Sequence, residues 1–257
     1  GKEKRFAPSP SELEPYLFPL MRAAVYGMFG VVVLHKLNHG FFDPAVSCAV
    51  QHYDILQSRV PVVVGVGQLN GIPIEALLTI VTEGSIPILL FFKWTRLLGL
   101  FVAIGFHYVM AINGFQGFSG FALAMYVPFL PREFFTDVVD MFNRLSRPVW
   151  TVVRWGFPLG WALFAFGFTA AEYVGRTYQT RRLGYAIFLL LSPVIGLVFA
   201  WLVARRWSLP ARPWPSERLT AAWQIVLVVL FLIHGLFPYF GLKTEAVLSI
   251  FSNLHTE

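Results

Sequence analysis

The fold class follows from residues 72–113, which read IPIEALLTIVTEGSIPILLFFKWTRLLGLFVAIGFHYVMAIN. Two apolar runs, 72–92 and 96–113, lie on either side of a short basic turn. A helix that crosses a bilayer needs about 20 mostly apolar residues. Each run is close to this length, so the stretch predicts two membrane-spanning helices joined by a tight turn.

The whole chain has the composition of a membrane protein. Hydrophobic residues make up 56% of its 257 residues and charged residues 13%, whereas soluble proteins carry about 25% charged residues. This balance excludes a disordered chain, a collagen-like chain and a nucleic-acid-binding domain. The single cysteine, Cys48, excludes an intrachain disulfide. We therefore expect a lipid bilayer as the surroundings and no nucleic-acid partner.

Further apolar runs extend this pattern to an all-α, polytopic bundle with about seven transmembrane helices. A polar tail is expected at 1–15, a single transmembrane domain at 16–242 and a C-terminal tail at 243–257. The spans are predicted near 16–37, 72–92, 96–113, 115–131, 149–174, 183–204 and 219–242. A tight turn at 113–115 is preferred to a helix broken within the membrane.

The connections predict two amphipathic helices that lie along the membrane surface. Residues 45–56 have a helical apolar rhythm, and residues 132–148 carry several phenylalanine and valine side chains on one side. The apolar segment 60–66 is too short to span and is a candidate re-entrant segment, as is its extension to 71. Residues 205–218 form a basic, proline-rich loop.

Basic residues orient the bundle, because cytoplasmic loops carry an excess of Lys and Arg. With seven crossings, fourteen of the twenty Lys and Arg residues fall on the side of the N-terminus. The N-terminus is therefore expected in the cytoplasm and the C-terminus outside. The expected location is a bacterial inner membrane.

Several polar side chains in the spans fall at similar depth, between the midplane and the outer face. Ionisable residues within spans are costly, and their default interpretation is functional. The candidate catalytic residues are Lys36, Glu83, His107 and His234, and the candidate cofactor-binding residues are His39 and Asn113. This clustering suggests an outward-opening polar cavity.

Structural alternatives exist for each of these residues. Lys36 and His39 are also explained as side chains that reach the interface, and Glu75 as an interfacial carboxylate. Glu83 and His107 are candidates to share a hydrogen bond, or to bond to neighbouring helices. A metal site would need several of these side chains at ligand distance, so no metal is expected.

Three segments resemble, in the same order, the vitamin K-dependent gamma-carboxylase superfamily, which includes bacterial horizontally transferred transmembrane domain (HTTM) proteins. LHKLNHGFFD at 34–43 is similar to the lysine segment of that family. Residues 83–131 resemble the part that follows, with an acidic residue, a short basic turn, Phe-His, Asn and a Phe-Leu-Pro exit. FSNLHTE at 251–257 is similar to the end of the membrane domain in bacterial members.

The resemblance implies a role for Lys36. In the animal carboxylase, the lysine at this position deprotonates vitamin K hydroquinone, and the oxidised quinol then drives proton removal from a substrate glutamate. A quinone is thus the cofactor that the resemblance suggests, in an outward-facing site. The family's Asn-Asn-His element and its extramembrane domain are not in this chain. We therefore expect a fragment of a longer protein, or a shortened member that has lost peptide carboxylation.

Three function classes follow. The favoured one is a non-catalytic or degenerate member that acts as a subunit of a larger membrane complex, with other membrane subunits as partners. The second is an enzyme acting on a quinone-like or lipid-like molecule, with Lys36 as base and Glu83, His107 and His234 positioning the substrate. A transporter is the weakest, because no internal repeat is evident.

Overall fold

The computed structural model describes residues 10–60, 67–113, 115–130 and 221–240, together with isolated positions between 134 and 219. The helices of this part of the chain belong to one compact unit, formed by 1–130 and 215–257, and residues 131–214 form a second unit. The prediction of an all-α chain is confirmed for the residues described, where a hairpin of two-residue strands is the one exception. Apart from those isolated positions, the spans predicted at 149–174 and 183–204, the surface helix at 132–148 and the loop at 205–218 lie outside the described residues, as do 61–66 and the C-terminal tail.

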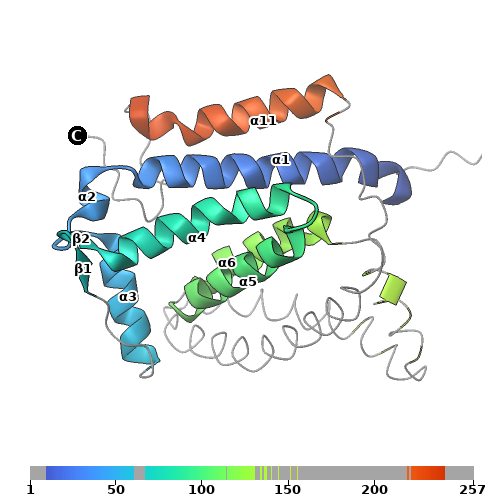
Figure 1. Ribbon diagram of the computed structural model, residues 1–257. Helices are drawn as coiled ribbons and strands as arrows, with labels where there is room; N and C mark the ends of the chain where they lie inside the picture. The colour runs from blue at the N-terminus through green and yellow to red at the C-terminus, as the bar shows by residue number, and fades with distance from the viewer. Residues whose placement is uncertain are drawn as a thin grey trace, which may run out of the picture. The chain divides into compact units, whose positions relative to one another are not determined.

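The first half of the unit leads from a long helix to a small hairpin (Figure 1). Its elements in order are α1 (Pro10–Lys36), α2 (His39–Phe42), α3 (Cys48–Arg59), β1 (Gln68–Leu69) and β2 (Ile72–Pro73). The strands pair antiparallel, with Leu69 opposite Ile72. Asn70 and Gly71 form the turn with φ of 52° and 82°. Asparagine and glycine are the residues that tolerate such positive φ values in a two-residue hairpin.

The second half consists of apolar helices. They are α4 (Ile74–Phe91), α5 (Arg96–Ile112), α6 (Gln116–Met125), the 3-10 turn η1 (Val127–Phe129), α11 (Ala222–Gly235) and the 3-10 turn η3 (Phe237–Phe240). Two helical segments, Glu14–Lys36 and Ile74–Phe91, are long and apolar enough to cross a membrane. Helix α1 begins at Pro10, six residues before the predicted start, because proline is favoured in the first turn of a helix.

The turn between α4 and α5 is held by side chains that cap α4. Arg96 is fully buried, and its Nε donates to the carbonyl oxygen of Leu90 at 2.8 Å. The hydroxyl of Thr95 donates to the carbonyl of Leu89 at 2.8 Å. The last carbonyls of a helix have no partner within the helix, so these bonds satisfy them. A Cβ on Gly99 would lie 2.9 Å from the backbone nitrogen of Leu90, so only glycine allows the two helices to approach this closely.

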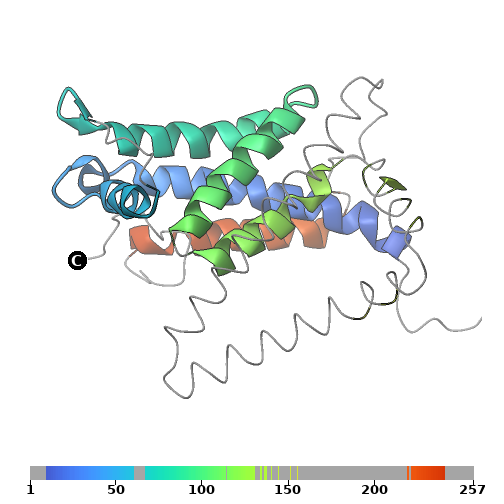
Figure 2. The ribbon, with the colours of Figure 1, turned by 90° about the horizontal axis from the view of Figure 1, so that it is seen from below.

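Helix α1 packs against α4 on one side and α11 on another (Figures 1 and 2). The buried Gln224 at the start of α11 donates to the carbonyl of Tyr16, at 2.6 Å. At the other end, the hydroxyl of Tyr239 donates to the carbonyl of Leu34, at 3.1 Å. The two helices therefore run in the same direction, although about 200 residues separate them in the chain. Helix α4 runs the opposite way to α1.

Candidate functional site

The end of α1 places a lysine in the interior of the unit. Helix α1 ends at Lys36, and Asn38 begins the short helix α2. The Asn38 side chain accepts from the backbone N–H of Phe41 at 3.0 Å and donates to the carbonyl of His35 at 2.7 Å. These bonds turn the chain so that the ring of the buried Phe41 lies 5.8 Å from Lys36 Nζ, at cation–π distance.

Lys36 forms a buried ion pair with Glu83. Its Nζ lies 2.8 Å from Glu83 Oε2, and the two side chains are only 2% and 7% exposed. Glu83 lies in the middle of α4. Removal of one partner from such a pair leaves an uncompensated charge, which typically costs about 3–5 kcal/mol. The pair therefore fixes the end of α1 against α4, and it carries a proton that either partner can hold.

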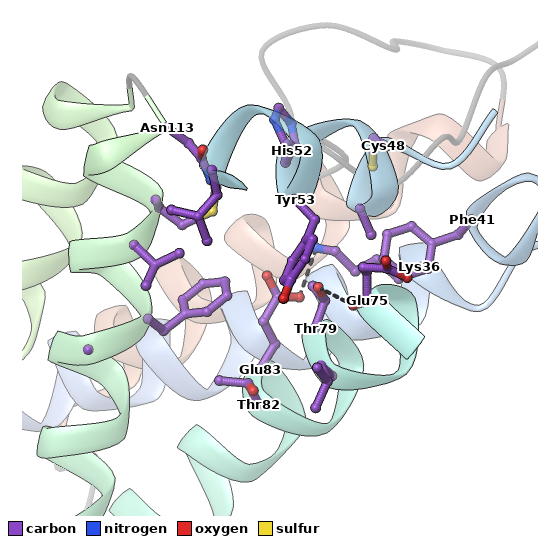
Figure 3. Close-up of a pocket in the computed structure, with 17 residues that line it drawn as sticks. Lys36, Phe41, Cys48, His52, Tyr53, Glu75, Thr79, Thr82, Glu83 and Asn113 are labelled. Atoms are coloured by element: carbon purple, nitrogen blue, oxygen red, sulfur yellow. Dashed lines mark hydrogen bonds and ion pairs between the residues drawn. The ribbon is translucent and has the colours of Figure 1, made fainter. Parts of the chain in front are cut away.

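The ion pair lies on the wall of a cavity of about 340 Å³. The cavity is bounded by the end of α1, by α2 and by one side each of α3, α4 and α5 (Figure 3). Its polar lining residues are Lys36, Cys48, His52, Tyr53, Glu75, Thr79, Thr82, Glu83 and Asn113. Its apolar lining residues are Phe41, Ala49, Leu56, Leu78, Gly105, Phe106, Val109 and Met110. A cavity of about 150 Å³ holds benzene, so this one has room for a larger ring system.

Helix α3 supplies one wall of the cavity. The helix agrees with the rhythm read at 45–56, and its residues Cys48, His52 and Leu56 recur every four positions, which places them on one face. Burial lowers the pKa of His52, and the positive charge of Lys36 lowers it further. His52 is therefore held neutral beside the ammonium. Its ring packs edge-on against Phe115, with centroids 5.1 Å apart.

The structure brings together three of the predicted site residues. Lys36, Glu83 and Asn113 all line the cavity, and Figure 3 shows Lys36 and Asn113 on different sides of it. Glu75 also lines the cavity and is 9% exposed. The Oδ1 atom of Asn113 is buried and makes no hydrogen bond with the residues described.

The suggested hydrogen bond between Glu83 and His107 is wrong. His107 Nε2 lies 2.9 Å from the hydroxyl of Tyr126 on the α6 side, and Glu83 pairs with Lys36 instead. Rings of Phe29, Phe106 and Phe118 surround His107. His107 thus belongs to the packing between α5 and α6, behind the cavity wall.

His39 and His234 do not share the cavity. His39 lies in α2 with an exposed side chain. His234 lies near the end of α11, with its ring 5.2 Å from that of Phe237. The expected convergence of both residues with Lys36 is therefore wrong. Helix α11 packs on α1, whereas the cavity is bounded by α3, α4 and α5.

Sequence reasoning missed the residues that α3 contributes: Cys48, His52 and Tyr53. The helical rhythm at 45–56 was the signal, but it was interpreted as a surface helix only. Within the residues described, no group of three or more His, Cys, Asp or Glu side chains is arranged to hold a metal ion. The whole cavity lining offers a cation, two carboxyls, an imidazole, a phenol and hydroxyls around an apolar space.

The comparisons leave the family expectation untested. No family model, curated protein or solved structure matches the chain.

Proposed function

We propose that this chain is a helical integral membrane protein whose cavity binds a ring-shaped, membrane-soluble molecule with an acidic hydroxyl, such as a quinol, and that Lys36 takes the proton of that hydroxyl. One observation carries the proposal. The amine of Lys36 is buried, paired with Glu83 and on the wall of a cavity whose lining surface is mostly apolar, although polar side chains border it. A lysine that reaches for the membrane surface would need neither burial nor a carboxylate partner.

The apolar outer surface of the unit supports a membrane location. Helix α11 exposes several large apolar side chains: Trp223, Ile225, Val226, Leu227, Val229, Leu230 and Ile233. Val81, Ile88 and Phe91 are similarly exposed on α4. Soluble monomers rarely leave such continuous apolar surface in water. We place the N-terminus in the cytoplasm and the C-terminus outside because of the asymmetry of the basic residues. The resemblance to bacterial HTTM proteins is our reason to propose a bacterial inner membrane.

The proton transfer follows from the ion pair. The proton first moves from the ammonium of Lys36 to the carboxylate of Glu83, which leaves an amine and a carboxylic acid. The ligand hydroxyl then donates its proton to the amine, so an oxyanion lies beside the Lys36 ammonium and Glu83 stays protonated. The summed charge of Lys36, Glu83 and the ligand is zero before and after both steps. In water, phenolic hydroxyls and lysine have pKa values near 10 and 10.4, so the second step is nearly balanced. The first step is uphill in water, where a glutamate has a pKa near 4.3, and it depends on burial, which favours the neutral forms of both groups.

The resemblance to the carboxylase superfamily supports the same role for Lys36, because it gives a quinol-deprotonating lysine to this position. The cavity residues described contain no counterpart of the Asn-Asn-His element of that family. Our proposal therefore covers binding and deprotonation of the ring compound, and not peptide carboxylation.

A second candidate is a non-catalytic subunit of a larger membrane complex. The exposed apolar face of α11 favours it, since other membrane subunits as well as lipid pack on such a face. That role does not require a buried lysine on a cavity wall. We therefore now favour the ligand-binding function over the subunit alone.

The test uses naphthol, a two-ring compound whose anion absorbs at longer wavelength than its neutral form. Purified protein at neutral pH is expected to bind naphthol and to show the absorption of the anion. The double variant Lys36→Met/Glu83→Leu is expected to fold and to lose the anion band. Lys93→Met, which removes an exposed lysine in the α4–α5 turn, is the matched control and should keep it.

Two results would contradict the proposal. One is naphthol that binds to the natural protein only in its neutral form. The other is an anion band that persists in the folded double variant.

A further inference from the structure

The wall that α5 presents to the cavity contains a gap. Gly105, Val109 and Asn113 follow one another at four-residue intervals and all line the cavity, so they share one stripe of the helix. Val109 and Asn113 carry side chains along this stripe. Gly105 carries none, and a Cβ built there would meet no atom within 4 Å.

Comparison with Gly99 shows that packing does not explain this glycine. Both residues lie in α5, but a Cβ on Gly99 would lie 2.9 Å from backbone and side-chain atoms of α4. Gly99 is thus required for the close contact between two helices. Glycine within a helix is unfavourable relative to alanine, and at Gly105 no close contact with another element compensates for it. What Gly105 does provide is space on the cavity wall.

We propose that Gly105 determines which ligands fit. The absence of a side chain lets one edge of a two-ring molecule lie against the backbone of α5, and a larger residue would exclude that molecule while admitting smaller ones. The inference rests on the proposed function only for the ring-shaped class of ligand, and it concerns the shape of the cavity and not its proton chemistry.

The chain contains its own reporter for this shape. Cys48 is the single cysteine in the sequence and lines the same cavity from α3. Because Cys48 lines the cavity, we expect a thiol reagent that carries a ring to place that ring in the cavity when it reacts there. The rate of alkylation of Cys48 therefore reports the free space, without need of a hydroxyl or of Lys36.

The experiment compares two reagents on the full chain in detergent. Naphthyl maleimide carries two fused rings, and iodoacetamide is small. We expect Gly105→Leu to slow the reaction with naphthyl maleimide about 10- to 100-fold, the range by which a filled pocket rejects a larger group. We expect its reaction with iodoacetamide to stay within about twofold of the natural protein, and Gly105→Ala to give a smaller slowing with the large reagent only.

The matched control is Gly84→Leu. Gly84 is a helical glycine of α4 next to Glu83, its Cβ would also meet no atom within 4 Å, and it is not part of the cavity lining. Both reagents should react with this variant as with the natural protein. Equal slowing by Gly84→Leu, or no slowing by Gly105→Leu, would overturn the inference.

The two proposals fail separately. If Gly105→Leu excludes the naphthyl reagent but naphthol is never deprotonated, the cavity shape is as inferred and the role of Lys36 is wrong. If naphthol is deprotonated but Gly105→Leu and Gly84→Leu react alike with the naphthyl reagent, the role of Lys36 is supported and the inference about Gly105 is wrong. Loss of the fold in Gly105→Leu would speed both reagents, and the graded Gly105→Ala variant would then decide: unchanged reaction with naphthyl maleimide would refute the inference.

Discussion

Helix α1 carries two buried cations, and they are used in different ways. Arg22 is 1% exposed and donates from Nε to the carbonyl of Pro128 at 3.0 Å, and its Nη2 donates to the same oxygen. Its guanidinium also lies 5.7 Å from the centre of the Phe129 ring. Lys36, fourteen residues later, is 2% exposed and meets the carboxylate of Glu83.

The difference lies in what each partner can exchange. A guanidinium keeps its proton in proteins, and a backbone carbonyl cannot take one. Arg22 therefore joins α1 to the 3-10 turn η1. Lysine and glutamate both titrate, so the second pair can pass a proton as well as hold two helices together. Burial is common to Arg22 and Lys36, so the proposed role of Lys36 rests on its titratable partner and on the adjoining cavity.

The largest expected effect concerns the Lys36–Glu83 pair. Lys36→Met alone and Glu83→Leu alone should each reduce the free energy of unfolding by about 3–5 kcal/mol, because each leaves a buried charge without its partner. The double variant should be close to the natural protein in stability, since an apolar pair of similar volume replaces the ions. Denaturant unfolding of the four proteins in detergent measures this cycle. Additive losses would show that the two residues do not interact.

Arg22 provides the contrasting case. Arg22→Met leaves the carbonyl of Pro128 buried and without these donors, so we expect a loss of about 1–3 kcal/mol in unfolding free energy. Naphthol binding and the anion band should be unchanged, because Arg22 does not line the cavity. If folded Arg22→Met no longer deprotonates naphthol, the proposed difference between Arg22 and Lys36 is wrong.

Alanine substitutions at Gly99 and Gly105 of α5 should change the stability of the protein in opposite directions. Gly99→Ala places a Cβ 2.9 Å from the backbone of α4, and such overpacking costs about 1–3 kcal/mol. Gly105→Ala enters open space and should stabilise the protein by about 0.4–1 kcal/mol, as alanine reduces the freedom of the unfolded chain. Thermal unfolding of both variants in the same detergent gives the comparison. Equal destabilisation would mean that Gly105 is also in close contact.

His52 gives the smallest effect and a pH dependence. Burial, and then the charge of Lys36, lower its pKa in the folded protein from the usual 6.5. The unfolded chain thus binds a proton at a higher pH than the folded one, so stability falls as the pH drops below about 6.5 towards the folded pKa. His52→Gln should remove this part of the acid sensitivity. The measurement is the unfolding midpoint between pH 7.5 and 5, and the same slope in both proteins would contradict it.

The sequence predicted the helices better than their contacts. The apolar run at 72–92, which opens with Ile72 and Pro73, and the run at 96–113 after the basic turn closely match α4 and α5. The Asn70-Gly71 turn signal was present but was not used to predict the β1–β2 hairpin. A long run of apolar residues predicts where a helix lies, because a lipid bilayer and a protein interior both favour apolar side chains.

The site was predicted only in part, because depth along a span does not specify the direction of a side chain. Lys36 and Glu83 lie at compatible depths and also face each other. His107 was placed at similar depth, but it points to Tyr126. The periodicity of one helix shows which of its residues share a face. Only the packing of several helices decides which faces meet.

In the proposed reaction, Lys36 and Glu83 together accept the proton of a bound hydroxyl. Infrared difference spectroscopy on naphthol binding tests it most directly, because protonated and ionised carboxyl groups absorb at different frequencies. We expect a protonated-carboxyl band to appear with the naphthol anion. The band should vanish in Lys36→Met/Glu83→Leu and persist in Glu75→Gln, which changes the other carboxyl of the cavity. A naphthol anion without that band, or a band that Glu75→Gln removes, would contradict the account.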